Sequence, residues 1–156
     1  MNPILYLSAR DIAARVARRE LTAEAVARAF IDHITATDAT VHAWQHFDAD
    51  AVLTQARALD AGSTTGALQG VPFGVKDLLD TGDMPTTYGS PIHAGHRPTT
   101  DAACVGTARA AGALVILLKL TFGTVAAMQV VHLLGWPLQE AAATPPGTWV
   151  EVAALA

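Results

Sequence analysis

The amino-terminal part of the chain has the hydrophobic spacing of two amphipathic helices. Ser8 is placed to cap the first helix, with Asp11 three positions on as a variant of the capping box, and we expect this helix to end near Glu20. Thr22 is placed to cap a second helix, which fades in the polar stretch 35–38. Between these limits apolar residues recur at helical spacing, at Ile12, Val16, Val26, Phe30 and Ile34.

Beyond residue 40 the pattern changes to alternating strands and helices. The expected segments are a strand at 41–47, a helix at 52–59, a strand ending at Lys76, a helix at 100–110 and a strand at 113–118. Turn residues between Lys76 and residue 100 indicate a long loop. This order predicts an α/β fold, in which amino-terminal helices are followed by a mixed, partly parallel sheet with right-handed crossover helices.

One of the two lysines of the chain ends a short apolar strand, in the segment Gly70-Val71-Pro72-Phe73-Gly74-Val75-Lys76-Asp77. The glycines and the proline favour a close approach and a sharp turn into the strand, while Phe73 and Val75 alternate as in a half-buried strand. Loss of solvation at the strand end favours the neutral amine, which can act as a general base near neutral pH. The alternative is an ordinary strand-end lysine that pairs with Asp77 or Asp80.

Further segments accompany this lysine motif. They include Leu7-Ser8-Ala9-Arg10-Asp11-Ile12, Gln55-Ala56-Arg57-Ala58-Leu59-Asp60, Met84-Pro85-Thr86-Thr87-Tyr88-Gly89-Ser90 and Gly112-Ala113-Leu114-Val115-Ile116-Leu117. With these segments, residues 1–119 resemble the amino-terminal portion of the amidase signature family, which comprises amide hydrolases and amidotransferase A subunits. The resemblance implies hydrolysis of small-molecule amides by a Ser-cisSer-Lys triad, without a cofactor. It identifies Lys76 as the base of that triad.

Residues 120–156 depart from the family pattern. By resemblance, a loop rich in glycine and serine should follow Lys119 and carry the nucleophile and the bridging cis-serine, yet no serine follows Ser90. Ser8 fits a helix cap, and Ser63 and Ser90 lie in loops without the setting of a nucleophile. We therefore predict an incomplete amidase signature fold, with residues 1–119 as the amino-terminal part of the domain and 120–156 as a divergent tail.

Two functions follow from this departure. The first is a truncated amidase-family protein that retains the lysine of the triad and lacks both serines. The alternative is a non-catalytic fragment or interaction module without amidase activity. Translation in a wrong reading frame also produces a sudden loss of resemblance like the one after Lys119, and the encoding DNA can test this hypothesis.

Composition limits the partners and the compartment. Hydrophobic residues make up 51% of the chain and charged residues 15%, which predicts exposed apolar surface and self-association. A net charge of -4 offers no basic patch for direct binding of nucleic acid. The single cysteine, Cys104, cannot form an internal disulfide, so we expect a cytoplasmic protein, and its alanine-rich helical setting predicts a packed thiol.

Metal, phosphate and membrane sites are not expected. His42 and His46, and likewise His93 and His96, have spacings that zinc sites use, but no carboxylate or cysteine completes a set of ligands. The chain also lacks the glycine-rich motifs that cradle phosphates. The uncharged run 120–136 is short for a membrane span and contains several polar residues.

Overall fold

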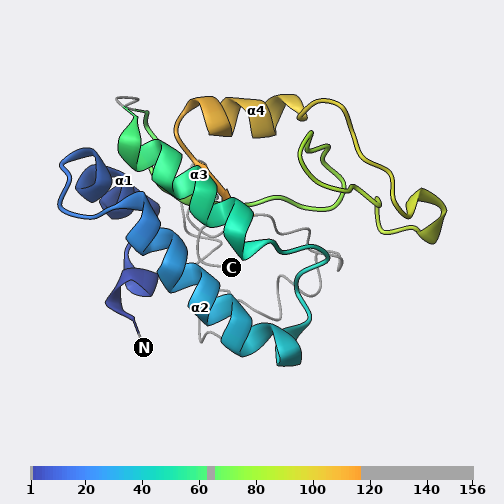
Figure 1. Cartoon of the computed structure of the whole chain (residues 1–156), viewed down its shortest axis with the longest axis horizontal. Coiled ribbons are helices and arrows are strands. Elements are labelled where there is room, and N and C mark those ends of the chain that lie inside the picture. The colour runs from blue at the N-terminus through green and yellow to red at the C-terminus, as the bar shows by residue number, and fades with distance from the viewer. Residues whose placement is uncertain (1, 63–65, 117–156) are drawn as a thin grey trace, which may run out of the picture.

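The computed structural model describes residues 2–62 and 66–116 of the chain. The elements follow in the order η1 (Pro3–Tyr6), α1 (Ala9–Ala17), α2 (Ala23–Val41), α3 (Ala49–Ala61), β1 (Pro72–Gly74), η2 (Pro91–His93), α4 (Ala103–Ala110) and β2 (Leu114–Ile116). Helices α2 and α3 lie side by side and pack against the small sheet (Figure 1). The core lies between these helices and the strands, where Val26, Val52, Leu114 and Val115 are fully buried.

The first two helices begin where the sequence predicts. The Ser8 hydroxyl accepts the backbone N–H of Asp11 at 3.1 Å and donates to the carboxylate of the same residue at 2.9 Å. The Thr22 hydroxyl accepts the N–H of Ala25 at 3.0 Å. α1 ends at Ala17, earlier than expected, because Arg19 adopts a left-handed conformation with φ 58°.

The predicted strand at 41–47 is wrong, because α2 continues through the polar stretch 35–38 and ends only at Val41. The Thr37 hydroxyl donates to the carbonyl of His33 at 2.8 Å, a bond that keeps threonine compatible with a helix. His42 then closes the helix in a left-handed conformation with φ 51°. The helix thus takes up Val41, with which the expected strand would have begun.

The sheet joins two segments that are distant in the sequence. β1 and β2 are parallel, with Pro72 opposite Leu114, Phe73 opposite Val115 and Gly74 opposite Ile116. Both strands lie within the segments predicted for them, although 117–118 lie outside the described residues. α4 precedes β2 on the connection between the strands, as expected for a helical crossover (Figure 1).

Gly70 allows the chain to pass close to the first two helices before it enters β1. Its φ is +68°, and a Cβ atom at this position would lie 3.1 Å from Cγ2 of Val16 and 3.3 Å from Cβ of Ala23. A larger residue would be strained by the backbone conformation and would crowd both helices. The close approach predicted for this glycine is confirmed.

α4 begins at Ala103, slightly later than predicted, because Asp101 is engaged elsewhere. Its carboxylate accepts the N–H of Gly82 at 2.9 Å and pairs with Nε of Arg109 at 2.9 Å. The helix buries Val105 and leaves Cys104 exposed, so the predicted packing of the thiol is wrong. Helical periodicity explains the difference, because adjacent residues on a helix point in different directions.

The described part of the chain contains no helix with the length and apolar character needed to cross a membrane. The uncharged run at 120–136, considered above for this role, lies outside the described residues.

Candidate active site around Lys76

Lys76 lies at the carboxyl edge of the two-stranded sheet. β1 ends at Gly74, which pairs with Ile116 at the end of β2, so the two parallel strands leave the sheet at the same edge. Val75 is fully buried, whereas the next residue, Lys76, is exposed. Open α/β sheets bind their ligands at this edge. The lysine is therefore placed where a side chain can reach a bound molecule.

The backbone turns sharply at Lys76. Its carbonyl oxygen accepts the N–H of Leu78 at 2.7 Å and the N–H of Leu79 at 3.0 Å. Leu78 is itself 55% exposed, so this turn presents both an amine and an apolar side chain to solvent. The described residues do not provide the loss of solvation that the sequence predicted for Lys76.

Lys76 forms no ion pair with a described residue. The ion pairs in the part of the chain that the structure describes are made by Arg18, Arg28, Arg57 and Arg109. The structure thus does not form the pairing with Asp77 or Asp80 that the alternative interpretation of this lysine expects.

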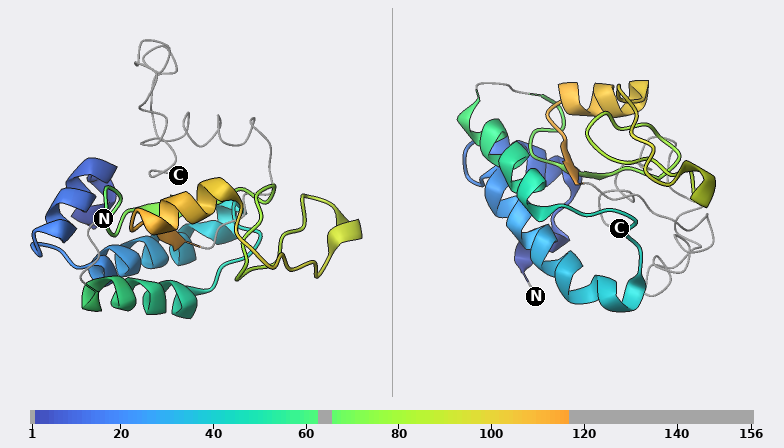
Figure 2. Two further views of the ribbon diagram at one scale, coloured as in Figure 1. Left: turned by 90° about the horizontal axis from the view of Figure 1, so that it is seen from above. Right: turned by 45° about the vertical axis from the view of Figure 1, so that its right-hand side comes forward.

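The segment after Lys76 is a long loop, as predicted, and the buried carboxylate of Asp77 holds it. This carboxylate accepts the N–H of Thr87 at 2.7 Å, the hydroxyl of Thr87, and the N–H of Gly89 at 3.3 Å. Beyond this turn the loop extends away from the helices and carries η2 (Figure 2). Sequence reasoning identified the turn at 88–91 but missed its carboxylate partner, which the tertiary structure supplies.

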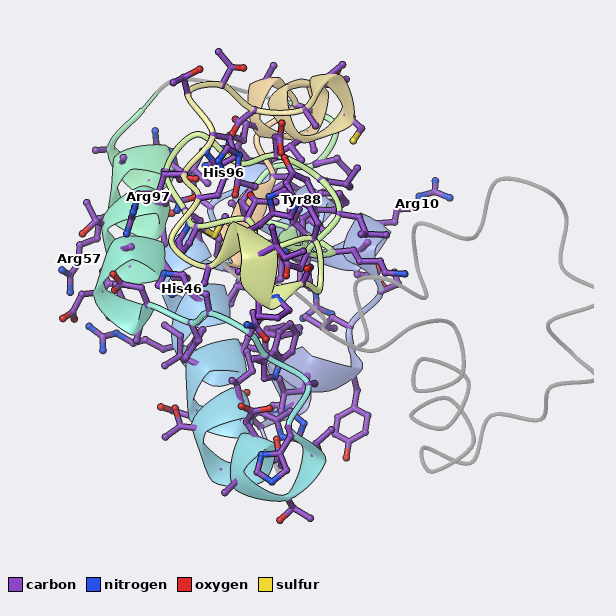
Figure 3. The ribbon with its side chains drawn as sticks, turned by 90° about the vertical axis from the view of Figure 1, so that its right-hand side faces the viewer. Arg10, His46, Arg57, Tyr88, His96 and Arg97 are labelled. Atoms are coloured by element: carbon purple, nitrogen blue, oxygen red, sulfur yellow. The ribbon has the colours of Figure 1, made fainter. Side chains whose placement is uncertain are left out.

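Tyr88 is the centre of a cluster of rings on this loop. Its phenol donates to Asp80 at 2.5 Å, and this hydrogen bond is the main reason that the pKa of Tyr88 lies above its ordinary value of 10.0. The Tyr88 ring lies 5.1 Å from that of His93 and 5.8 Å from that of His96, measured between centroids. Figure 3 shows Tyr88 and His96 close together on the loop.

The serines within the described residues cap helical turns. Ser8 caps α1, and the Ser90 hydroxyl accepts the N–H of Ile92 at the start of η2, at 3.3 Å. Ser63 lies outside the described residues, as does the whole tail 120–156. The structure therefore gives no described serine a nucleophile's contact with Lys76.

The histidine pairs do not assemble a metal centre in the described ranges. Residues 2–62 and 66–116 contain no group of three or more histidine, cysteine or carboxylate side chains that could hold a metal ion. His42 closes helix α2, and the rings of His93 and His96 pack with Tyr88. His42, His93 and His96 therefore have structural roles in the described part of the chain.

A surface hollow lies on a different part of the molecule. It is lined by α1 and the segment that approaches β1, through Ala9, Arg10, Ala13, Ala14, Ala17, Gly66, Ala67 and Leu68. Lys76 does not line it. Because Arg10 is its only ionisable lining residue, we place the candidate chemistry at Lys76.

Comparison with known proteins agrees with the sequence motif and with this fold. The Amidase family profile matches residues 25–125, a range that includes Lys76 and both strands. This chain belongs to the amidase family. The structure also resembles the native peptide amidase from Stenotrophomonas maltophilia, with a TM-score of 0.68 and 31% identity over 76% of this chain and 25% of that one.

Curated amidase relatives are more similar in sequence. The chain is 46% identical over 120 residues to the A subunit of the glutamyl-tRNA(Gln) amidotransferase from Salinispora arenicola (strain CNS-205). It is 44% identical over 120 residues to the corresponding protein from Acidothermus cellulolyticus (strain ATCC 43068 / DSM 8971 / 11B). Each match covers 74% of this chain and 24% of the relative. The chain thus spans about a quarter of the length of these relatives, and it has the amidase signature fold over the matched portion.

Proposed function

We propose that residues 1–119 are the amino-terminal part of an amide-hydrolysing domain in which Lys76 is the base of a Ser-cisSer-Lys triad. The position of Lys76 carries this proposal, because the amine is exposed and forms no described ion pair at the edge where parallel sheets bind ligands. In this proposal residues 120–156 form a divergent tail that lacks the loop with the two serines.

In the complete reaction, the neutral amine of Lys76 accepts a proton from the bridging serine, which takes one from the nucleophilic serine. The serine oxygen bonds to the amide carbon, the C–N bond breaks, and the proton moves to the leaving nitrogen. Water then releases the acyl group. Lys76 is exposed among the described residues, so the rest of an amidase domain would have to cover it for the amine to lose solvation.

The names of the relatives support an amide as the class of substrate. The two curated relatives are amidotransferase subunits and the structural relative is a peptide amidase, so each name refers to amide chemistry. We infer a small-molecule amide for the complete domain. The net charge of -4 argues against direct contact between this chain and nucleic acid. The cytoplasm is the compartment we infer, since one cysteine cannot form an internal disulfide.

The alternative function is that of a non-catalytic module that associates with itself. Four large apolar residues among those described are exposed: Ile92 at 88%, Tyr6 at 67%, Leu78 at 55% and Val41 at 49%. Such side chains support association when they gather in one patch. Sedimentation velocity over a range of protein concentrations tests this alternative, because a monodisperse monomer would contradict self-association.

An amide-hydrolysis assay tests the catalytic proposal. The 156-residue chain and its Lys76→Ala variant should both give background rates, because a triad without its nucleophile retains little activity. Turnover that depends on Lys76 in this chain would show that another residue is the nucleophile, with Ser90 and Thr148 as the first candidates.

The same assay on a chain extended by a restored reading frame tests the role of Lys76 directly. Lys76→Ala should abolish turnover there, while Arg10→Ala, an exposed cation on α1, should not. A specific role for Lys76 would be contradicted if both variants lost turnover equally. It would also be contradicted if Lys76→Ala kept full turnover.

A further inference from the structure

Asp77 is a buried carboxylate that the chemistry proposed for Lys76 does not use. Only 2% of Asp77 is exposed, and a carboxylate leaves water at a large cost unless donors replace its hydration. One turn supplies three donors: the N–H of Thr87 at 2.7 Å, the hydroxyl of Thr87, and the N–H of Gly89 at 3.3 Å. Asp77 follows Lys76 directly in the sequence. Its carboxylate thus binds a turn that begins ten residues later.

This turn has a conformation that needs outside support. Tyr88 has φ +53° and Gly89 has φ +70°, so two successive residues are left-handed. A bulky residue such as tyrosine rarely adopts this conformation, and it persists only where its surroundings hold it. The bonds from Asp77 to the residues on either side of Tyr88 provide that support.

Tyr88 reports on the position of the turn. Its phenol donates to Asp80 at 2.5 Å, and its ring contacts those of His93 and His96. Because Asp77 holds the residues before and after Tyr88, the direction of the phenol toward Asp80 depends on the same anchor. Asp77 and Asp80 therefore tie the loop at two points to the segment that follows Lys76.

We propose that Asp77 is a positioning residue of the Lys76 site: its carboxylate fixes the Thr87–Gly89 turn beside the chain that carries the lysine and so sets one border of the site. A contribution of this turn to catalysis rests on the function proposed above. The anchoring of the turn by Asp77 does not depend on that function. An asparagine of the same shape cannot replace the carboxylate, because its NH₂ group would face a donor.

Hydrogen exchange of individual backbone amides tests the anchor in the full chain. Asp77→Asn should speed the exchange of at least one of the Thr87 and Gly89 amides by about tenfold or more, because they bond to different carboxylate oxygens and asparagine keeps only one acceptor oxygen. Thr87→Val keeps the charge of Asp77 and removes one donor, so it should give a smaller change in the same direction. Asp32→Asn, an exposed carboxylate on α2, is the matched control and should change neither rate.

The titration of Tyr88 provides a readout that a general loss of stability would not move. In a Tyr6→Phe background Tyr88 is the only tyrosine, so absorbance follows its phenol alone. Thr87→Val keeps the charge of Asp77 and should lower the pKa of Tyr88, because a loosened turn weakens the bond to Asp80. Asp77→Asn should lower it further, because it also removes the negative charge of Asp77.

Unchanged amide exchange in Asp77→Asn, or an unchanged Tyr88 pKa in Thr87→Val, would overturn the proposal. If Asp77→Asn does not fold, both measurements on Thr87→Val decide the question. Neither measurement uses turnover, so a failure of Lys76-dependent hydrolysis would overturn the proposed function and leave the anchoring result intact.

Discussion

The carboxylate of Asp60, near the end of α3, accepts the backbone N–H of Ala23, the first residue of α2, at 2.8 Å. Its other oxygen accepts the N–H of Glu24 at 3.0 Å, while Thr22 caps the N–H of Ala25. A helix leaves its first N–H groups without partners and carries partial positive charge at that end. The Asp60 carboxylate accepts two of these N–H groups and places a negative charge at the positive end of α2. It thereby links the end of α3 to the start of α2.

Replacing Asp60 with alanine should therefore destabilise the fold. We expect the free energy of unfolding to fall by about 1–2 kcal/mol, because two helix N–H groups lose an ionised acceptor. Urea unfolding followed by circular dichroism measures the change. Asp32→Ala, on the exposed surface of α2, is the control, and an equal effect in both variants would contradict a specific role for the Asp60 cap.

The bond between Tyr88 and Asp80 should make stability depend on alkaline pH. The folded chain raises the pKa of Tyr88, chiefly through this bond, so the folded state holds the phenolic proton more tightly than the unfolded state does. This stabilisation is complete below the ordinary pKa of 10.0 and is lost as pH rises through the raised value.

Asp80→Asn should reduce this loss of stability, as shown by urea midpoints measured between about pH 8 and 11. The variant should be less stable than the parent below about pH 10, where the bond is intact in the parent, and this difference should shrink above that pH. An equal fall of the midpoint in the parent and the variant above about pH 10 would count against the bond.

Cys104 should react with a thiol reagent in the native chain. The residue is exposed on α4, so an aromatic disulfide reagent should label one thiol per chain without denaturant. Cys104→Ser should give no signal. Labelling that requires urea would indicate that association or another part of the chain covers this face of α4.

The encoding DNA provides the most direct test of the tail. If residues 120–156 result from a shifted reading frame, one of the other frames, read from about the codon for Leu118, should encode a glycine- and serine-rich loop with both missing serines. The resemblance to the family pattern ends after Lys119 and the profile match extends to residue 125, so the shift would lie in this short range. Two frames without such a loop would favour the non-catalytic function.

The helix starts and the lysine motif could be predicted because they depend on neighbours in the sequence. Ser8 and Thr22 accept N–H groups three residues ahead, so these bonds need no partner from a distant segment. The motif around Lys76 likewise identified the family that the profile and the relatives support. The end of α2 was missed, since polar residues at 35–38 resemble a loop when solvent exposure is unknown.

Contacts between distant segments could be obtained only from the folded chain. Asp77 was considered as a partner for Lys76, yet its carboxylate turns inward to Thr87 and Gly89. Cys104 is expected inside, yet α4 buries the adjacent Val105 and leaves Cys104 exposed. Local spacing determines which groups can bond within a turn or a helix. Which carboxylate is buried, and which lysine remains free in water, depends on how separate segments pack together.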